Sequence, residues 1–287
     1  VITLGHPGTL PKVNRKAVEY AVKMGLACNS SITRRNVFAR KNYFYPDLPK
    51  GYQLTQDKNP ICVGGFVPIT LDSGEKKEVA LTRIHMEEDA GKSMHLAGEV
   101  DTLVDFNRAG VPLIEIVTEP DMRSSEEAYK VLAEIKKLVV YLDVCDGNME
   151  EGSLRCDANV SVRLKGDQEL GKKVEVKNMN SFRNVARAIE HEFERQITLL
   201  EKGEEIISET RELFDKFVNT YGLPEYDAGV LTDQKDIALW FESLCKHTNN
   251  YKAASNWMMG PIKSYLNELT LKIEDFPLNV SQIAALI

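Results

Sequence analysis

Residues 154–164, LRCDANVSVRL, alternate apolar and polar side chains over their whole length. Successive side chains of a β-strand point to opposite faces, so this segment predicts a strand with one apolar and one polar face. A polar loop at 165–171 leads to a second alternating segment at 172–178. The two segments together predict a β-hairpin whose polar face carries many hydrogen-bonding groups.

Helical and strand patterns alternate through the rest of the first 211 residues. Apolar residues recur at helical spacing in three segments, 12–26, 125–142 and 181–202. Strand patterns occupy three others, 66–71, 78–86 and 111–118. The spacing of Ser124 and Glu127 predicts a capping box at the start of the second helix. Asn178 to Ser181 precede the third helix and are typical N-cap residues.

Strand patterns end at about residue 212, and four helical patterns follow at roughly 212–221, 233–246, 252–268 and 280–287, with a loop at 222–229. We therefore predict an α+β fold. A mixed or antiparallel sheet with flanking helices forms a domain over 1–211, and an all-helical domain covers 212–287. The chain starts at Val1 rather than Met and stops within an apolar helix pattern, so we expect it to continue in a longer protein.

Composition narrows the classes of function. With 36 basic and 43 acidic residues the net charge is −7, so any RNA contact must be local or depend on partners. The five cysteines never form a Cys-x-x-Cys pair, which argues against a zinc finger and a disulfide framework. No apolar run reaches the roughly 18 residues that a membrane span needs. We expect no membrane contact and a reducing compartment: the cytoplasm or, in a eukaryote, a mitochondrial or plastid matrix.

Two acidic features could share a divalent cation. Glu87, Glu88 and Asp89 follow one strand pattern, where their concentrated charge requires solvent or a cation. Glu115 lies among apolar residues of another strand, where burial of an unpaired carboxylate is costly. Oxygen ligands suit Mg²⁺. The alternatives are a solvated acidic turn for the first feature and the polar face of an edge strand for the second.

Two other features present groups for a polar ligand. The polar face of the hairpin could bind a phosphate or an adenosine, or it could be an ordinary solvent-facing sheet with cross-strand ion pairs. The aromatic and basic loop at 40–53 could stack on unpaired bases and contact phosphate, or it could pack on a core. The chain contains no Walker A loop, no nucleotide-binding Gly-x-Gly-x-x-Gly and no Gly-x-Ser-x-Gly elbow. Any nucleotide chemistry must therefore use another type of site.

Seven motifs together resemble the B subunit of the tRNA-dependent amidotransferase. They are KNYFYPDLPKGYQ (41–53), HMEEDAGK (85–92), PLIEIVTEPD (112–121), MEEGSLRCDANVS (149–161), KNMNSF (177–182), YGLPEYDA (221–228) and ASNWMMG (254–260). The likeness covers nearly the whole chain. It implies that the first domain is the family's cradle domain and that a helical domain follows it.

The resemblance also implies a reaction. ATP phosphorylates the side-chain carboxylate of Glu-tRNA(Gln) or Asp-tRNA(Asn), and ammonia then displaces the phosphate to give Gln-tRNA(Gln) or Asn-tRNA(Asn). The family's amidase, its A subunit, supplies the ammonia from glutamine, and a small C subunit joins the amidase to the B subunit. We therefore predict ATP as co-substrate, Mg²⁺ as cofactor, and aminoacyl-tRNA and the A and C subunits as partners.

The predicted site residues fall into three groups. The metal ligands, which match family carboxylates, are Glu87, Glu88 and Glu115, and the catalytic residues are Glu88, Glu115 and His85. We assign the following residues to substrate and ATP binding: Lys41, Tyr43, Tyr45, Lys50, Tyr52, Lys92, Arg108, Arg155, Asp157, Asn159, Ser161, Arg163 and Lys177.

Three parts of the family pattern have no counterpart in this sequence. They are an N-terminal Glu-x-His pair that belongs to the metal site, an aromatic and acidic segment expected after Arg211, and the tail domain. Two other functions also stay open at this point. The chain could be a non-catalytic tRNA-binding scaffold of the same complex, or a free-standing metal-dependent hydrolase.

Overall fold

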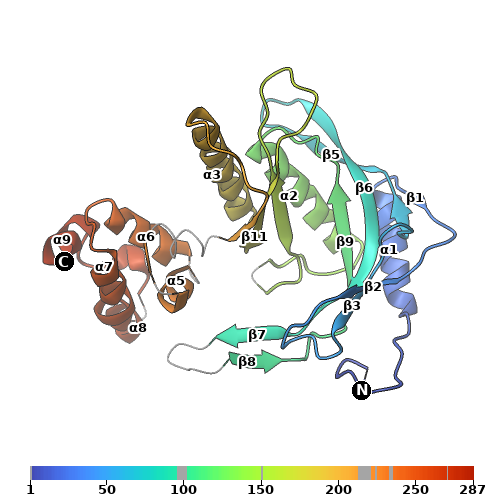
Figure 1. Cartoon of the computed structure of the whole chain (residues 1–287), viewed down its shortest axis with the longest axis horizontal. Helices are drawn as coiled ribbons and strands as arrows, with labels where there is room; N and C mark the ends of the chain where they lie inside the picture. The colour runs from blue at the N-terminus through green and yellow to red at the C-terminus, as the bar shows by residue number, and fades with distance from the viewer. Residues whose placement is uncertain are drawn as a thin grey trace. The chain divides into compact units, whose positions relative to one another are not determined.

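The computed structural model describes residues 2–95, 102–149, 151–212, 221–223, 225–232, 235–269 and 271–287. Their contacts define two compact units, Val1–Cys156 with Asn180–Glu190, and Asp157–Met179 with His191–Ile287. Strands and two covering helices form the first unit, and helices make up most of the second (Figure 1). The predicted α+β class is confirmed. The predicted division between residues 211 and 212 stays a prediction.

The first unit is built around a 13-residue strand, β6 (Lys76–Glu88). It forms antiparallel pairs with three other strands, β4, β5 and β9, and β1 extends the sheet from β4. Two small antiparallel pairs, β2–β3 and β7–β8, complete the strands of this unit. The bounds are β1 (Ser31–Ile32), β2 (Ala39–Asn42), β3 (Tyr52–Thr55), β4 (Cys62–Val63), β5 (Phe66–Thr70), β7 (Lys92–His95), β8 (Thr102–Asp105) and β9 (Pro112–Thr118).

A β-bulge at Thr82 interrupts the pairing of β6 with β9. Leu81 pairs with Thr118, and Arg83 pairs with Val117, so β6 carries one residue more than its neighbour at this point. An extra residue in one strand shifts the phase of side-chain alternation beyond it.

The bulge changes which residues of β6 face the core. Leu81 is buried before the bulge, whereas Ile84 and Met86 are buried after it, so the core-facing positions change from odd to even numbers. His85 and Glu87 therefore share the face opposite Ile84 and Met86. That opposite face carries the polar groups described below.

Helices α1 (Arg15–Ala27) and α2 (Ser125–Tyr141) pack with the sheet around one apolar core. Asn14 caps α1 by accepting a hydrogen bond from Lys16 N. The buried residues of α1 are Ala21, Met24 and Gly25, whereas Leu26, the last residue of the predicted helical segment, is exposed. The fully buried members of the core are Ala21, Met24, Cys28, Ile61, Cys62, Val67, Ile69, Val79, Leu81, Ile84, Met86, Val131, Ile135 and Val139.

The predicted capping box of α2 forms only in part. Ser124 Oγ accepts from Glu127 N at 3.2 Å, as expected. The Glu127 carboxylate, however, accepts from Arg123 N at 2.7 Å and pairs with Lys77 Nζ at 2.7 Å. The lysine lies on β6, so Glu127 connects the start of the helix to the sheet.

The second unit begins with a three-stranded sheet in the order β10 (Cys156–Val160), β11 (Val174–Met179) and β12 (Thr210–Glu212). The predicted strand over 154–164 therefore ends early, at Val160. Just beyond the end of this strand, the backbone of Gly171 lies close to that of Val162, because a Cβ on Gly171 would lie 2.1 Å from Val162 O. β12, which runs parallel to β11, was not predicted. α3 (Phe182–Glu201) contributes residues to both units, and Ser181 Oγ accepts from Asn184 N at its start.

Helices fill the rest of the second unit around a separate apolar core. The predicted loop at 222–229 is wrong in part, because a helix starts at Glu225. The predicted helix at 212–221 lies largely outside the described residues. None of the helices in the described ranges is long and apolar enough to cross a membrane. The helices are α5 (Glu225–Thr232), α6 (Lys235–Cys245), α7 (Tyr251–Trp257), η1 (Met258–Ile262), α8 (Lys263–Leu269), η2 (Ile273–Asp275) and α9 (Val280–Leu286).

Gly25 lets α1 approach β4 closely, and this contact can be tested. A Cβ at this position would lie 2.4 Å from Cys62 Sγ and 3.0 Å from Ile32 Cδ1. Gly25→Ala should therefore destabilise the chain by about 1–3 kcal/mol through overpacking, although alanine favours a helix. Urea denaturation followed by circular dichroism measures this change. Leu26→Ala, at the adjacent exposed position, should stay within about 0.5 kcal/mol of the unsubstituted chain. Equal stability of the two variants would contradict the packing argument.

Candidate functional site

His85, Glu87 and Glu115 form a cluster on the polar face of the first unit. The register of β6 and β9 places His85 opposite Glu115, and alternation places Glu87 on the same face as His85. His85 Nε2 lies 3.4 Å from Glu87 Oε1 and 3.6 Å from Glu115 Oε2. One ligand atom from each residue lies within 4.8 Å of the other two. The Glu115 side chain is 48% exposed, so the predicted cost of burying it does not arise.

The hydrogen bonds around His85 indicate its tautomer. Arg83 Nε donates to His85 Nδ1 at 3.3 Å, so Nδ1 is the acceptor nitrogen. In a neutral imidazole the other nitrogen then carries the proton. Nε2 therefore donates toward Glu87 and Glu115 and orients both carboxylates. This role is that of a group that supports ligands rather than of a ligand.

Glu87 is held in its ionised form. Its burial raises the pKa, but hydrogen bonds from His85 and Thr55, together with the positive charge of Lys41, outweigh burial and lower the pKa below its ordinary value. Gln53 Nε2 also donates to this carboxylate, at 3.5 Å. An ionised carboxylate is the form that binds a cation.

Glu88 belongs to a different group. Alternation directs it away from Glu87, and its Oε1 accepts from Leu54 N at 2.8 Å and pairs with Lys50 Nζ. Both side chains of this ion pair are largely buried. The role of Glu88 as a third metal ligand stays a prediction, and the position of its carboxylate beside Lys50 does not support it.

Past the residues of β6 that pair with β4, two buried glutamines form hydrogen bonds with the β6 backbone. Gln56 Oε1 accepts from Met86 N at 3.1 Å, and Gln53 Nε2 donates to the carbonyl oxygen of Glu88. Tyr43 Oη donates to Gln53 Oε1 at 2.8 Å, which fixes the orientation of that amide. Burial, together with nearby carboxylates such as Asp47, raises the pKa of Tyr43, so the hydroxyl keeps its proton.

The donor set on this face fits a hard divalent cation. Glu87 and Glu115 offer carboxylate oxygens, and Mg²⁺ commonly binds one or two carboxylates while keeping water and phosphate ligands. His85 Nε2 donates to Glu87 and lies 3.6 Å from Glu115 Oε2. A cluster of this kind also occurs as a metal-free hydrogen-bond network, so the predicted Mg²⁺ stays a prediction.

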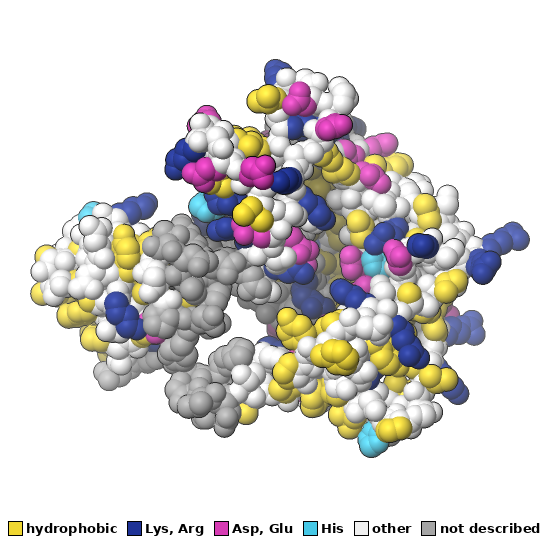
Figure 2. Space-filling view, in the orientation of Figure 1, with side chains coloured by type: hydrophobic (Ala, Val, Ile, Leu, Met, Phe, Trp, Pro, Cys, Tyr) yellow, Lys and Arg dark blue, Asp and Glu magenta, His cyan; other side chains and the backbone are white. Residues whose placement is uncertain are grey.

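Arg108 and Arg155 both contact Asp89, the acidic residue that follows Glu88. Arg155 Nη2 lies 2.6 Å from Asp89 Oδ2, and Arg108 Nε lies 3.4 Å from the same oxygen. In the space-filling view, acidic and basic side chains lie interleaved around a histidine on this unit (Figure 2). Lys92, at the start of β7, is exposed and stands opposite Asp105 of β8.

The aromatic loop contains one ring that is covered by cations. The Tyr52 ring has Arg40 Cζ at 4.5 Å and Lys50 Nζ at 4.8 Å from its centroid, which satisfies its π face without a ligand. Lys41 Nζ lies 5.8 Å from the Tyr43 ring. The sequence did not distinguish Tyr52 from the other aromatic residues.

Two other aromatic side chains of this loop are open to solvent. Phe44 is 90% exposed and Tyr45 is 65% exposed. Tyr43 packs edge-on against Tyr45 and is itself half-buried. Phe44 and Tyr45 are therefore the rings with area available for stacking.

The remaining predicted binding residues lie in the second unit. Lys177 Nζ lies 3.7 Å from Asp157 Oδ2 and 3.5 Å from Glu175 Oε2, which makes it part of a cross-strand ion pair. Asn159 is exposed on β10, Ser161 follows the end of that strand, and Arg163 Nη1 donates to Gln168 O. The role of these five residues, Asp157, Asn159, Ser161, Arg163 and Lys177, in binding a substrate stays a prediction.

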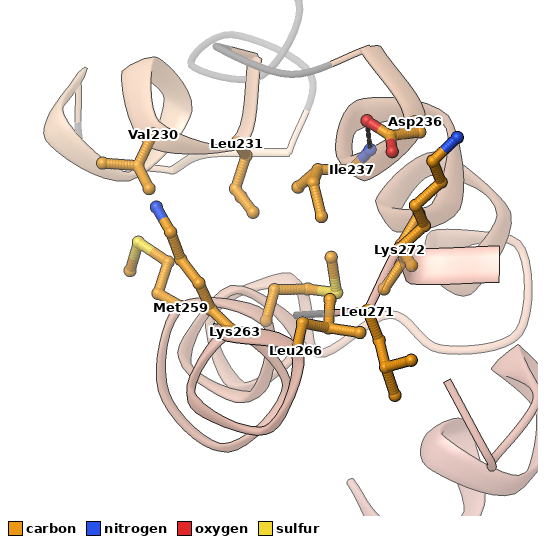
Figure 3. A pocket seen from close by; sticks show the side chains of 11 residues that line it. Val230, Leu231, Asp236, Ile237, Met259, Lys263, Leu266, Leu271 and Lys272 are labelled. Atoms are coloured by element: carbon orange, nitrogen blue, oxygen red, sulfur yellow. Dashed lines mark hydrogen bonds between the residues drawn. The ribbon is translucent and has the colours of Figure 1, made fainter. Parts of the chain in front are cut away.

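A pocket of about 150 Å³ lies among the helices of the second unit. Its walls are mostly apolar, and Leu231, Ile237 and Leu266 point toward one another across it (Figure 3). Asp236 Oδ1, on its wall, accepts from Ile237 N at 3.1 Å. None of the residues predicted for catalysis or binding lines this pocket.

Three residues around the acidic cluster were not predicted from the sequence. Thr55 and Gln53 bind Glu87, and Arg83 fixes the tautomer of His85. Gln53 and Arg83 stand in or next to quoted motifs, but a single sequence carries no sign that their side chains converge.

The comparisons with known proteins agree with the motifs. Residues 1–253 match the family described as GatB/GatE catalytic domain, and residues 239–287 match the GatB domain. The chain belongs to the GatB family.

Relatives of this family share close to half of their aligned residues with the chain. Three proteins named as the B subunit of aspartyl/glutamyl-tRNA(Asn/Gln) amidotransferase illustrate this. They come from Bdellovibrio bacteriovorus (45% identity), Caldicellulosiruptor bescii (46%) and Clostridium tetani (43%). Each alignment includes the whole chain and 70%, 71% and 70% of the respective relative.

Titration with Mn²⁺ distinguishes the two possible ligand sets. Glu115→Gln should weaken Mn²⁺ binding at least about tenfold, because it removes one of two charged ligands. Glu88→Gln should leave the affinity within about twofold, because Glu88 pairs with Lys50 and can still accept a hydrogen bond as glutamine. Calorimetry or the electron paramagnetic resonance signal of free Mn²⁺ measures both. An equal loss in the two variants would restore Glu88 as a ligand.

Proposed function

We propose that this chain is a catalytic subunit of a tRNA-dependent amidotransferase. The membership of the GatB family and the names of its relatives support the assignment. The observation that carries the catalytic part is the convergence of Glu87 and Glu115, with His85 between them, on the polar face of one sheet. Aminoacyl-tRNA, the amidase (A) subunit and the small C subunit are the proposed partners, and the cytoplasm or an organelle matrix is the proposed compartment.

The proposed reaction has two steps. A carboxylate oxygen of the Glu-tRNA(Gln) or Asp-tRNA(Asn) side chain attacks the terminal phosphorus of ATP, and ADP leaves. Ammonia then attacks the carbonyl carbon of the acyl phosphate, phosphate leaves, and the nitrogen loses a proton. The first step is needed because a carboxylate is a poor electrophile, whereas an acyl phosphate has a good leaving group.

The residues of the cluster have distinct proposed roles. Glu87 and Glu115 would hold Mg²⁺, which neutralises the charge of the transferring phosphoryl group when it is bound. His85 orients the two carboxylates through its Nε2 proton, and Arg83 fixes that proton's position. The buried pair of Lys50 and Glu88 anchors the aromatic loop to β6 beside the cluster.

The exposed rings of the aromatic loop are proposed to bind the single-stranded acceptor end of the tRNA. Unpaired bases stack on exposed aromatic side chains, and nearby lysines attract the phosphate backbone. Phe44 and Tyr45 offer the rings, and Lys41 offers an exposed charge in the same segment. Because the contact is local, the overall net charge of −7 does not oppose it.

The catalytic role is tested in the complex assembled with the amidase and the small C subunit. Glu115→Gln should lower phosphate release from ATP that depends on Glu-tRNA(Gln) by roughly a hundredfold, because it removes a ligand of the phosphoryl-transfer site. Arg15→Ala, an exposed substitution on α1, should leave the rate unchanged. Full turnover by Glu115→Gln with intact tRNA binding would favour the scaffold function, and phosphate release by the chain alone would favour a hydrolase.

The role of the aromatic loop is tested by tRNA affinity. Tyr45→Ala should weaken binding of the aminoacyl-tRNA to the complex by about 1–3 kcal/mol, the usual contribution of one stacked base. Tyr141→Ala removes a tyrosine that is even more exposed, at the end of α2, and serves as the matched control. Fluorescence anisotropy measures both dissociation constants. The proposed contact is absent if Tyr45→Ala binds tRNA as tightly as Tyr141→Ala.

A further inference from the structure

Asp89 brings two arginine side chains to a single carboxylate oxygen. Arg155 Nη2 donates to Asp89 Oδ2 at 2.6 Å, and Arg108 Nε lies 3.4 Å from that oxygen. The other oxygen, Asp89 Oδ1, accepts from Ala90 N at 3.0 Å. Asp89 is itself buried, so its carboxylate offers a fixed point for both guanidinium groups.

The backbone places Asp89 on the same face as the acidic cluster. Asp89 N donates to Val111 O at 2.8 Å, and Gly110 N donates to Asp89 O at 2.8 Å, so strand pairing continues beyond Glu88. Alternation then puts Asp89 on the face of His85 and Glu87. Two residues of a strand span about 7 Å, so the arginine pair begins next to the proposed cation site.

Arg108 is held from a second direction as well. Its Nε donates to Ala90 O at 3.2 Å and its Nη2 donates to Gly91 O at 2.7 Å. A Cβ on Gly91 would lie 2.8 Å from Asp105 O and 3.0 Å from Asp47 O, so the backbone is tightly enclosed here. These contacts fix the plane of the Arg108 guanidinium group.

Arg155 comes from the motif at 149–161. Turn hydrogen bonds order the segment before it: Ser153 N donates to Asn148 O at 2.9 Å and Leu154 N donates to the same oxygen at 3.2 Å. A Cβ on Gly152 would lie 3.9 Å from Arg108 Nη1, so this segment passes close to the second arginine. The fold thus brings together two motifs that are separated in the sequence.

The pair has excess positive charge and is open to solvent. Two guanidinium groups face one carboxylate, and their side chains are 51% exposed for Arg155 and 36% for Arg108. A guanidinium group carries five N–H donors in a fixed plane and matches the oxygens of a phosphate group. Because both guanidinium groups are already held at one oxygen, they lose less side-chain conformational entropy when a phosphate binds.

We propose that Asp89 is a positioning residue that holds Arg108 and Arg155 as a binding pair for the polyphosphate of a nucleotide. The proposal rests on the proposed function, since the cation site beside it would hold another phosphate of the same ligand. A purely structural role for the three residues is the competing interpretation, because exposed ion pairs often bind no ligand.

The direction in which one substitution changes anion affinity distinguishes the two interpretations. Asp89→Asn keeps the size of the side chain and removes one negative charge. A structural or purely electrostatic role predicts unchanged or tighter anion binding, because the net positive charge increases. The positioning role predicts binding about tenfold weaker, because Arg155 loses its anchor beside Arg108, which the carbonyl oxygens of Ala90 and Gly91 still hold.

The experiment titrates the full chain with inorganic pyrophosphate by calorimetry, without metal. Arg155→Lys, which keeps the charge but loses the planar donors, should also weaken binding about tenfold. Arg15→Ala, an exposed arginine on α1, should bind pyrophosphate as the unsubstituted chain does. Thermal unfolding and Mn²⁺ affinity of each variant establish that the polar face of β6 remains folded.

Unchanged or tighter pyrophosphate binding by a folded Asp89→Asn chain overturns the proposal. Displacement of pyrophosphate by ATP supports the nucleotide, whereas displacement by a short single-stranded RNA and not by ATP overturns that assignment. The result is independent of turnover. Intact phosphate release by Glu115→Gln would refute the proposed catalytic role and leave the pyrophosphate measurement valid. Loss of phosphate release in Glu115→Gln, together with unchanged pyrophosphate binding by Asp89→Asn, would refute only the arginine pair.

Discussion

The extra residue at Thr82 is the constraint on which the core and the candidate site both depend. A slip of one residue transfers every side chain of a strand to the other face. Without the bulge, the alternation that buries Val79 and Leu81 would direct His85 and Glu87 into the apolar core. Burying an unpaired carboxylate costs several kcal/mol. The apolar residues on both sides of the bulge therefore stabilise one register, and that register presents the polar groups together.

The three consecutive carboxylates at the end of β6 avoid mutual repulsion by having different partners. Glu87 interacts with His85 and Thr55, Glu88 with Lys50, and Asp89 with two arginines. Thr55 and Lys50 come from the segment around β3, and the two arginines come from later in the chain, so folding of these segments around β6 and charge compensation depend on each other.

The sequence predicts the elements of this fold better than it predicts their faces. Regular alternation identified β10 and β11, strand-like segments identified β5, β6 and β9, and apolar spacing identified α2, because these signals are local. Apolar residues of β6 change phase from 79 and 81 to 84 and 86, but such a change can mark a bulge or the end of a strand, and only the pairing with β9 distinguishes them. On α3, Glu192 and Gln196 are buried, whereas Phe193 is exposed. Gln196 donates to Val160 O and Glu192 pairs with Arg195, and such polar burial depends on partners distant in the sequence. For the candidate site, the motifs indicated Glu87 and Glu115 but not the supporting role of Arg83.

The two glutamines along β6 have a consequence for association. The outer edge of a strand presents free N–H and C=O groups, to which an extended segment of another protein can add by β-augmentation. At Met86 and Glu88 the side chains of Gln56 and Gln53 already occupy these groups. An incoming strand would have to displace both amides from buried positions. This stretch of the sheet is thereby closed to strand addition, and a partner that approaches it must bind through side chains instead.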